Sequence, residues 1–351
     1  MSTPKPTPTP QQQRHQNIVD ALYFIHMHGW LRPIELGGFL WPKNALPRAP
    51  GYAIAKVLQQ LRLVHAIVLP DRVGRALVLA RRGAALLREN GIATAQAQEC
   101  WQCARSWRHE LIAAGVLAAL YKDGWDILPE REIRRRTGSH QTTKIPDGLA
   151  CDRGGNWWWI EVEHARKSGP QLRRLATHIS ATSGKVEICG MRTTGVLLAY
   201  PKDVRDEGGH RIDHRRRVTH AAETWIKGPV PILWAPCQML GAGVLSVTTE
   251  SEVLYPSAAR RVLKVLDARK WEAGGDGDSW IGTHPPHTAY VWHDEEYGSG
   301  WWSDVEGPNL GDECAAYSAT LSGAKMAAAQ RIADALAKGK TNAEFLTMSQ
   351  R

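Results

Sequence analysis

Hydrophobic positions in the first quarter of the chain follow a helical spacing in some segments and a strand pattern in others. Apolar residues recur every three or four positions in the first kind of segment, and shorter apolar runs form the second kind. The helical segments are Arg14–Trp30, Pro33–Leu40, Gly51–Leu63 and Arg82–Asn90. The strand segments are Val64–Leu69 and Ala76–Ala80, separated by a turn at Asp71–Gly74. This order predicts a winged helix-turn-helix domain over residues 14–92.

After a linker, strand and helix patterns alternate through the middle of the chain. Helices are predicted at Ser106–Lys122, Ser168–Ser180 and His214–Trp225. Strands are predicted at Asp126–Ile133, Thr143–Cys151, Trp157–Glu163, Gly195–Tyr200 and Pro231–Ala235. Such alternation is typical of a mixed α/β layer, here over residues 104–267.

The two ends of the chain differ from the middle in composition. Residues 1–13 are rich in Pro, Thr and Gln, which predicts a disordered tail. Over residues 280–340 a β-meander and one helix predict a small α+β module, with strands Ala289–His293, Gly300–Val305 and Glu313–Ser318 and helix Ser322–Lys338. The module contains the tryptophans Trp292, Trp301 and Trp302. They either stack on nucleic-acid bases or form the core of the module, and the second interpretation is favoured in so small a module. The acidic run at residues 294–296 argues against a phosphate contact there.

Charge adds a class of partner to this α/β picture. The 351 residues include 44 Lys and Arg against 35 Asp and Glu, and the net charge of +9 favours a polyanion such as nucleic acid. The six cysteines include one C-x-x-C pair, Cys100 and Cys103, without a second pair at zinc-ligand spacing. No apolar run reaches roughly 18 residues and no signal peptide opens the chain, so we expect no membrane partner and a cytoplasmic location.

The third predicted helix and the turn between the two strands carry the candidate DNA contacts. In a winged helix, Gly51–Leu63 would enter the major groove and the turn would form the wing. The candidate DNA-binding residues are Lys56, Gln59, Gln60 and Arg62 on the helix, and Arg72 and Arg75 on the wing. The alternative is a winged helix used only for dimerisation.

A possible hairpin in the middle of the chain brings acidic residues together. The segment Asp152–Asn156 contains two glycines and suits a tight turn. Residues whose numbers sum to 308 then face each other, which places Asp147 opposite Glu161. Side chains alternate along a strand, so Glu163 shares the face of Glu161. The alternative is that both glutamates lie on a solvated strand face.

Three carboxylates on one face would repel one another unless a cation lies among them. A hard divalent ion accepts oxygen ligands, so we expect Mg²⁺ or Mn²⁺ held by Asp147, Glu161 and Glu163. Such an ion polarises a phosphate oxygen and lowers the pKa of a bound water for attack on a phosphodiester. The sequence therefore predicts a metal-dependent phosphodiesterase site.

These residues resemble the motif of the PD-(D/E)XK nuclease superfamily. Pro146-Asp147 and Glu161-Val162-Glu163 match it, with Glu163 where the family usually has lysine. The resemblance implies a restriction-endonuclease-like fold in which Asp147, Glu161 and Glu163 are catalytic. It also implies that Lys167 replaces the missing lysine, that Glu110 is a further metal ligand, and that His109 touches metal or phosphate. The alternative for His109, at the start of a helix, is a capping or packing residue.

Together with the N-terminal winged helix, residues 14–235 resemble the replication-relaxation or MobC-like proteins of plasmids and integrated mobile elements. The resemblance implies a bacterial, magnesium-dependent endonuclease that acts on double-stranded DNA and binds other mobile-element proteins. A homodimer is a further possibility. Arg173 and Arg174, with Arg215–Arg217, would contact phosphates. The missing lysine favours an alternative, a non-catalytic DNA-binding accessory or regulatory protein that keeps the nuclease fold. A third hypothesis is a protein–protein adaptor.

Overall fold

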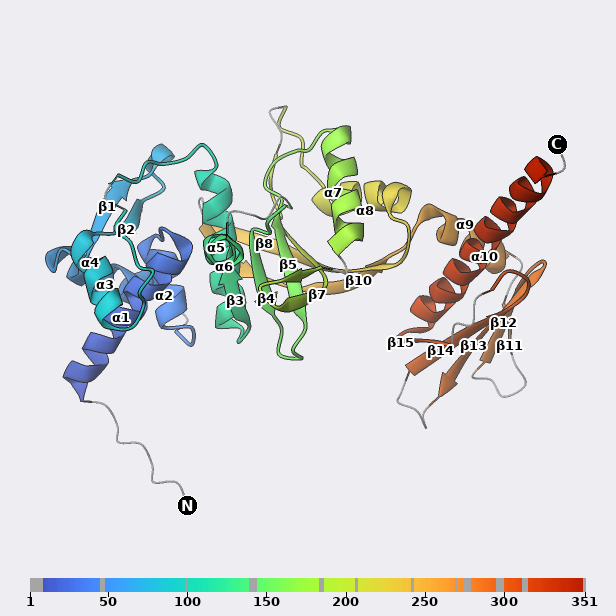
Figure 1. Ribbon diagram of the computed structural model, residues 1–351, viewed down its shortest axis with the longest axis horizontal. Coiled ribbons are helices and arrows are strands. Elements are labelled where there is room, and N and C mark those ends of the chain that lie inside the picture. Colours follow the sequence, from blue (N-terminus) through green and yellow to red (C-terminus); the bar gives the residue numbers. More distant parts are fainter. Residues whose placement is uncertain are drawn as a thin grey trace, which may run out of the picture. The chain divides into compact units, whose positions relative to one another are not determined.

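The computed structural model describes residues 9–44, 48–98, 100–138, 144–182, 186–205, 208–240, 243–268, 271–273, 279–294, 300–310 and 315–349 (Figure 1). It divides into two compact units. The first comprises Met1–Arg166, Thr182–His214 and Leu233–Ser251, and the second Lys167–Ala181, Arg215–Ile232 and Glu252–Arg351. Helices and several separate sheets are present, which confirms the predicted mixed α/β class.

Three helices, a two-stranded sheet and a fourth helix form the N-terminal part of the first unit. Their bounds are α1 Pro10–His28, α2 Pro33–Leu40, α3 Arg48–Gln60, β1 Val64–Val68, the 3₁₀ turn Pro70–Arg72, β2 Arg75–Leu79 and α4 Arg81–Glu89. The element order is the one that the hydrophobic pattern predicts. Helices α2 and α3 pack so closely that a Cβ at Gly51 would stand 2.0 Å from the carbonyl oxygen of Pro33.

Helix α1 begins earlier than the sequence predicts. Thr9 caps it by accepting a hydrogen bond from the backbone of Gln12, and Pro10 occupies the first helical position. Residues 10–13 are therefore helical, and the prediction of disorder is wrong for them. Residues 1–8 of the predicted tail lie outside the described residues.

Helix α5 (Trp107–Lys122) is buried on nearly all sides because it serves two neighbours (Figure 1). It packs against α2 on one side, where a Cβ at Gly38 would lie 3.6 Å from the Cβ of Ala118. On the other side it shares one hydrophobic core with the strands, including Trp158, Ile160 and Val162. A helix that is apolar all round is the expected solution for such a position.

The main sheet of the first unit has the strand order β8-β7-β5-β4-β3, with β6 paired to β7 and β9 paired to β8. The strands are β3 Asp126–Pro129, β4 Gly148–Cys151, β5 Trp157–Val162, β6 Glu187–Ile188, β7 Met191–Pro201, β8 Val230–Leu240 and β9 Gly243–Val247. Strands β3, β4 and β5 are antiparallel, whereas β5 and β7 are parallel. The five strands that the sequence predicts in this region are all present in part.

One predicted strand is too long. The chain leaves the strand conformation after Pro129 and forms helix α6 (Glu130–Thr137). Glu130 pairs with Arg134 within this helix, while Glu132 pairs with Arg135 and Arg136. Acidic residues in the first turn and arginines in the last turn also interact favourably with the helix dipole. The prediction that the strand extends to residue 133 is therefore wrong.

The second unit contains helices and a separate antiparallel sheet. Its elements, with the junction segments, are α7 Gly169–Thr182, α8 His214–Trp225, β10 Glu250–Leu254, α9 Ser257–Ala268, β11 Glu272–Ala273, β12 Ser279–His284, β13 His287–Asp294, β14 Gly300–Glu306, β15 Ala316–Ser318 and α10 Leu321–Ser349. Strands β11 to β15 are hydrogen-bonded in sequence order, which confirms the predicted meander and helix. Trp301 packs against the core shared by this sheet, α9 and α10.

Sequence patterns missed α9, β11 and β12, and part of the predicted strand Glu313–Ser318 lies outside the described residues. Within the described parts of the chain, no helix combines the length and the apolar composition that a membrane crossing requires.

Candidate active site

The hairpin β4–β5 has the register that the turn at Asp152–Asn156 predicts. Gly148 faces Ile160 and Cys151 faces Trp157, so paired residue numbers sum to 308. The backbone N–H of Asp152 donates to the carbonyl of Asn156 at 3.0 Å, and Gly155 has a φ of 84°. Beyond Gly148 the pairing departs from this register: the N–H of Asp147 donates to the carbonyl of Ile160 at 3.1 Å, one position short of the predicted partner Glu161.

Asp147 lies at the open end of this hairpin with both carboxylate oxygens engaged. Oδ2 accepts a hydrogen bond from the backbone N–H of Val162 at 2.8 Å. Oδ1 lies 2.8 Å from Nε2 of His109, which projects from the first turn of α5. The side chain is 15 % exposed, so solvent still reaches it.

Glu161 and Glu163 are both buried, each with a relative exposure of 4 %. Oε2 of Glu161 forms an ion pair with Nζ of Lys144, and Oε1 accepts a hydrogen bond from Nε1 of Trp159 at 2.5 Å. The backbone N–H of Glu163 donates to Ala199 on β7 at 2.8 Å. The alternative of a solvated strand face is therefore wrong for this face of β5.

Two histidines flank the open end of the hairpin. Nδ1 of His109 lies 3.4 Å from Nδ1 of His164, and their ring centroids are 5.4 Å apart. Desolvation lowers the pKa of His109, but the hydrogen bond and charge of Asp147, together with the charge of Glu161, outweigh it and raise that pKa. A protonated His109 partly neutralises the carboxylates around it.

Lys144 and His164 are site residues that the sequence reasoning missed. Lys144 stands three positions before Asp147 on the segment that enters β4, and His164 directly follows Glu163. Their closeness in sequence to the acidic motif was the available signal. The proposed lysine, Lys167, belongs to the second unit, where its carbonyl accepts a hydrogen bond from Nη2 of Arg217 at 2.6 Å.

Glu110 contacts different residues from those that bind Asp147 and Glu161. Its Oε2 accepts a hydrogen bond from Nε1 of Trp30 at 2.8 Å, and its Oε1 accepts one from Ser106 at 2.7 Å. Glu110 and Asp147 nevertheless line one common cavity. The structure thus connects the acidic site to the N-terminal helices through α5.

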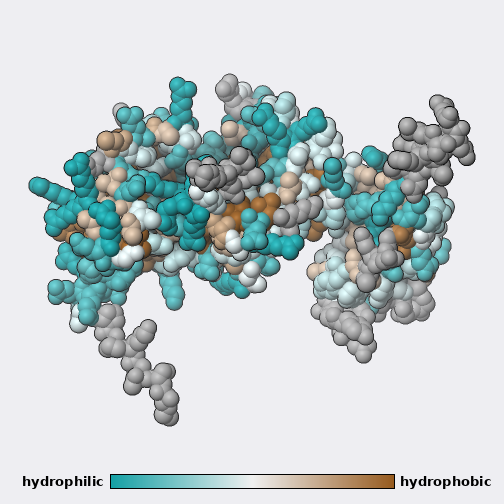
Figure 2. Space-filling model, in the orientation of Figure 1, coloured by the Kyte–Doolittle hydropathy of each residue, from teal (hydrophilic) through white to brown (hydrophobic). Residues whose placement is uncertain are grey.

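Most candidate DNA contacts are accessible, but Arg62 lies in the turn after α3, with a φ of 54°, and not on the helix as predicted. The side chains of Lys56, Gln60, Arg62 and Arg75 are exposed, and that of Arg72 lies outside the described part of the chain. Gln59 is half-buried, and its Nε2 donates to the carbonyl of Ala55 at 3.1 Å. Hydrophilic residues dominate this region on the face drawn in Figure 2.

The turn between β1 and β2 is tied to the start of α5. Asp71, with a φ of 56°, forms an ion pair with Arg108. Arg32 donates from Nη1 to the carbonyl of Val73 at 3.1 Å and pairs with the buried Glu35. The turn therefore has a defined position next to the helix that carries His109.

The basic helices of the second unit divide into engaged and exposed arginines. Arg215 pairs with Glu252 at 2.9 Å, and Arg217 donates to the carbonyl of Lys167. Arg173 and Arg174 are exposed on α7, and the guanidinium of Arg173 lies 3.9 Å from the ring centroid of the exposed Trp225. Arg173 and Arg174 are thus better placed than Arg215 or Arg217 to meet a phosphate.

The donor set at the open end of the hairpin is chemically suited to a divalent ion, since it combines buried carboxylates with imidazoles. In the described side chains, however, no three His, Cys, Asp or Glu residues are arranged to hold a metal as they stand. Binding would require the carboxylates to exchange present partners such as Lys144 or His109. Comparisons of the chain with protein-family models, curated proteins and solved structures gave no significant match.

Proposed function

We propose that this chain binds double-stranded DNA and hydrolyses its phosphodiester bonds with Mg²⁺ or Mn²⁺ at Asp147, Glu161 and Glu163. The observation that carries the proposal is the register of β4 and β5, with Asp147 bonded to the backbone on either side of Glu161. Glu161 and Glu163 are buried and Asp147 is partly exposed, with Lys144 paired to Glu161 and His109 to Asp147. A divalent ion would take the place of these cationic partners.

Each residue has a role in this proposal. Asp147, Glu161 and Glu163 would hold the ion, with Glu110 as the further ligand inferred from the nuclease resemblance. When bound, the ion would supply Lewis-acid polarisation of a phosphate oxygen and a water of lowered pKa. Lys144, already paired with Glu161, is placed to stabilise charge on the attacked phosphate, a role that the resemblance assigns to Lys167.

Binding of the duplex is assigned to the N-terminal elements, which we interpret as a winged helix. Helix α3 would enter the major groove with Lys56 and Gln60, while Arg62, in the turn after the helix, and Arg75 would contact the DNA backbone. The ion pair between Asp71 and Arg108 links this module to α5, which carries His109. On this interpretation the protein belongs with the PD-(D/E)XK-type, replication-relaxation or MobC-like proteins of bacterial mobile elements.

A non-catalytic DNA-binding accessory protein is the second candidate, and one observation favours it. Both oxygens of Asp147 and both of Glu161 already accept contacts from protein groups. Such a network satisfies the carboxylates without a metal and would stabilise the scaffold alone.

A plasmid-nicking assay with Mg²⁺ or Mn²⁺ separates the two candidates. The nuclease proposal predicts metal-dependent nicking by the wild type, loss of nicking in Asp147→Ala, and full activity in Asp126→Ala, a matched exposed carboxylate on β3 of the same sheet. Fluorescence anisotropy across a salt series measures DNA binding in parallel, because phosphate contacts weaken as salt rises. Binding without nicking by any of the proteins would favour the accessory role.

A further inference from the structure

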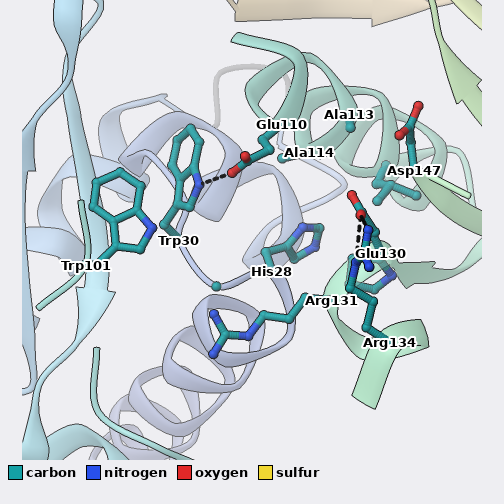
Figure 3. A pocket seen from close by; sticks show the side chains of 13 residues that line it. His28, Trp30, Trp101, Glu110, Ala113, Ala114, Glu130, Arg131, Arg134 and Asp147 are labelled. Carbon is teal, nitrogen blue, oxygen red and sulfur yellow. Dashed lines mark hydrogen bonds and ion pairs between the residues drawn. The ribbon is translucent and has the colours of Figure 1, made fainter. Parts of the chain in front are cut away.

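A cavity of about 250 Å³ lies beside the acidic hairpin, between the end of α1, helix α5 and the start of α6. We call it the Trp30 cavity; it is lined by residues that include Trp30, His28, Glu110, Arg131 and Asp147. Figure 3 shows Trp30 and Trp101 at one end and Asp147 at the other, with His28 between them. Drug-sized ligands occupy pockets of about 300–1,000 Å³, so this cavity suits a smaller, flat group.

The walls of the Trp30 cavity combine aromatic surface with hydrogen-bonding groups. Trp30 and Trp101 both line it, with ring centroids 5.7 Å apart and an interplanar angle of 52°. His28 also lines the cavity, between the tryptophans and Asp147 (Figure 3). The side chain of Arg131 packs against Gly29, where a Cβ would come within 2.6 Å of Nη1 of Arg131.

These groups select the chemistry of an occupant. A purely apolar molecule would displace water from charged lining groups such as Glu110, Arg131 and Asp147 without replacing its hydrogen bonds, which is costly. The lining carries both signs of charge, from Glu110, Glu130 and Asp147 and from Arg131 and Arg134, so it does not select a lone anion. A nucleobase has two flat apolar faces and an edge that carries both donors and acceptors, so it fits this lining.

We propose that the Trp30 cavity binds a single nucleobase. The base comes either from an unpaired position of a DNA strand or from a free nucleotide. The strand source rests on the proposed function, because Asp147 belongs to both the cavity and the acidic hairpin. A strand bound beside the acidic hairpin can place one base in the cavity, whereas a free nucleotide needs no cleavage site.

The test measures binding in EDTA, so that its result is independent of any metal-dependent cleavage. Anisotropy compares a duplex that has one unpaired adenine with the same duplex carrying an abasic site at that position. In the strand arm, the wild type prefers the unpaired adenine by about 5- to 150-fold, the range expected for one stacked base. In the free-nucleotide arm, calorimetry detects dAMP binding while the two duplexes bind equally.

The variant Ala114→Leu fills the cavity from α5 and abolishes whichever preference the wild type shows. Its matched control is Ala119→Leu on the same helix outside the cavity, which retains the preference. Trp101→Ala, at a half-buried position, repeats the test should Ala114→Leu fail a thermal-melting check of folding; Tyr317→Ala, an exposed aromatic in the second unit, is its control.

The proposal is overturned if the wild type neither prefers the unpaired adenine nor binds dAMP. It is also overturned if folded Ala114→Leu and Trp101→Ala keep the wild-type preference. Either outcome leaves the nicking comparison between the wild type and Asp147→Ala unaffected, so failure of the cavity proposal and failure of the nuclease proposal are separate results.

Discussion

The two ends of the hairpin β4–β5 each hold an aspartate, and they differ in what binds it. At the turn, Asp152 accepts hydrogen bonds from Gly154, Asn156 and Trp158, all within six positions of it. At the open end, Asp147 is bound by Val162 and by His109, which is 38 positions away along the chain (147 minus 109). One carboxylate is satisfied locally, and the other depends on the tertiary structure.

The difference also concerns charge. Desolvation raises the pKa of Asp152, but hydrogen bonds from neutral donors outweigh it and lower that pKa. Asp147 and Glu161 instead face titratable cationic groups, His109 and Lys144. The neutral donors around Asp152 hold the turn. His109 and Lys144 can instead release their carboxylates to a metal ion and pair with a phosphate. The open end is therefore where we propose the chemistry.

The largest expected effect separates these two aspartates by activity. Asp147→Ala should reduce metal-dependent nicking by at least about 10²-fold, because it removes a proposed metal ligand and transition-state contact. Asp152→Ala should nick at a rate close to the wild type at a temperature where it is folded. Equal losses in both variants would contradict the distinction between the two ends.

The second effect tests the ion pair at the open end through stability. Lys144→Ala leaves the buried Glu161 without its ammonium partner. Lys144 is half exposed, so solvent screens the pair, and we expect a loss of about 1–3 kcal/mol in the free energy of unfolding. Urea denaturation measures it, with Lys122→Ala at the exposed end of α5 as the control. A variant as stable as the control would show that Glu161 does not depend on Lys144.

The third effect tests the turn. Asp152→Ala removes the acceptor for Gly154, Asn156 and Trp158 and should lower the free energy of unfolding by about 1–2 kcal/mol. The cost should rise with pH as Asp152 ionises: the lowered pKa means that its contribution is present above the unfolded pKa and is lost as the pH falls through the folded pKa. Denaturation at two pH values checks both points, and a pH-independent cost would contradict them.

The smallest effect is the pH dependence that His109 contributes. Its pKa is raised in the folded protein, so its stabilising contribution is complete below the unfolded pKa of 6.5 and is lost as the pH rises through the folded pKa. Melting curves from mildly acidic to mildly alkaline pH should therefore show a steeper loss of stability in the wild type than in His109→Gln. Identical profiles would mean that His109 is not held as the imidazolium by Asp147.

Local patterns were enough to predict the hairpin and much of the N-terminal part. The bounds of α2 and α8 agree with the predicted segments, and the register of β4 and β5 follows from one turn. Helix α6 could not be found in this way. Its segment, Glu130–Thr137, has a single apolar residue, Ile133, so there is no hydrophobic period to read, and pairs such as Glu130 with Arg134 form only once the helix exists.

By itself, the sequence determined which residues of the hairpin face one another, because a tight turn and the alternation of side chains act over a few positions. Only the tertiary structure decided the partners of those residues. His109 on α5 contacts Asp147, and Trp30 donates a hydrogen bond to Glu110, which lies 80 positions further along the chain. Such contacts depend on how helices pack against a sheet, which no local spacing records, so the acidic motif was visible in the sequence while its cationic surroundings and the neighbouring cavity were not.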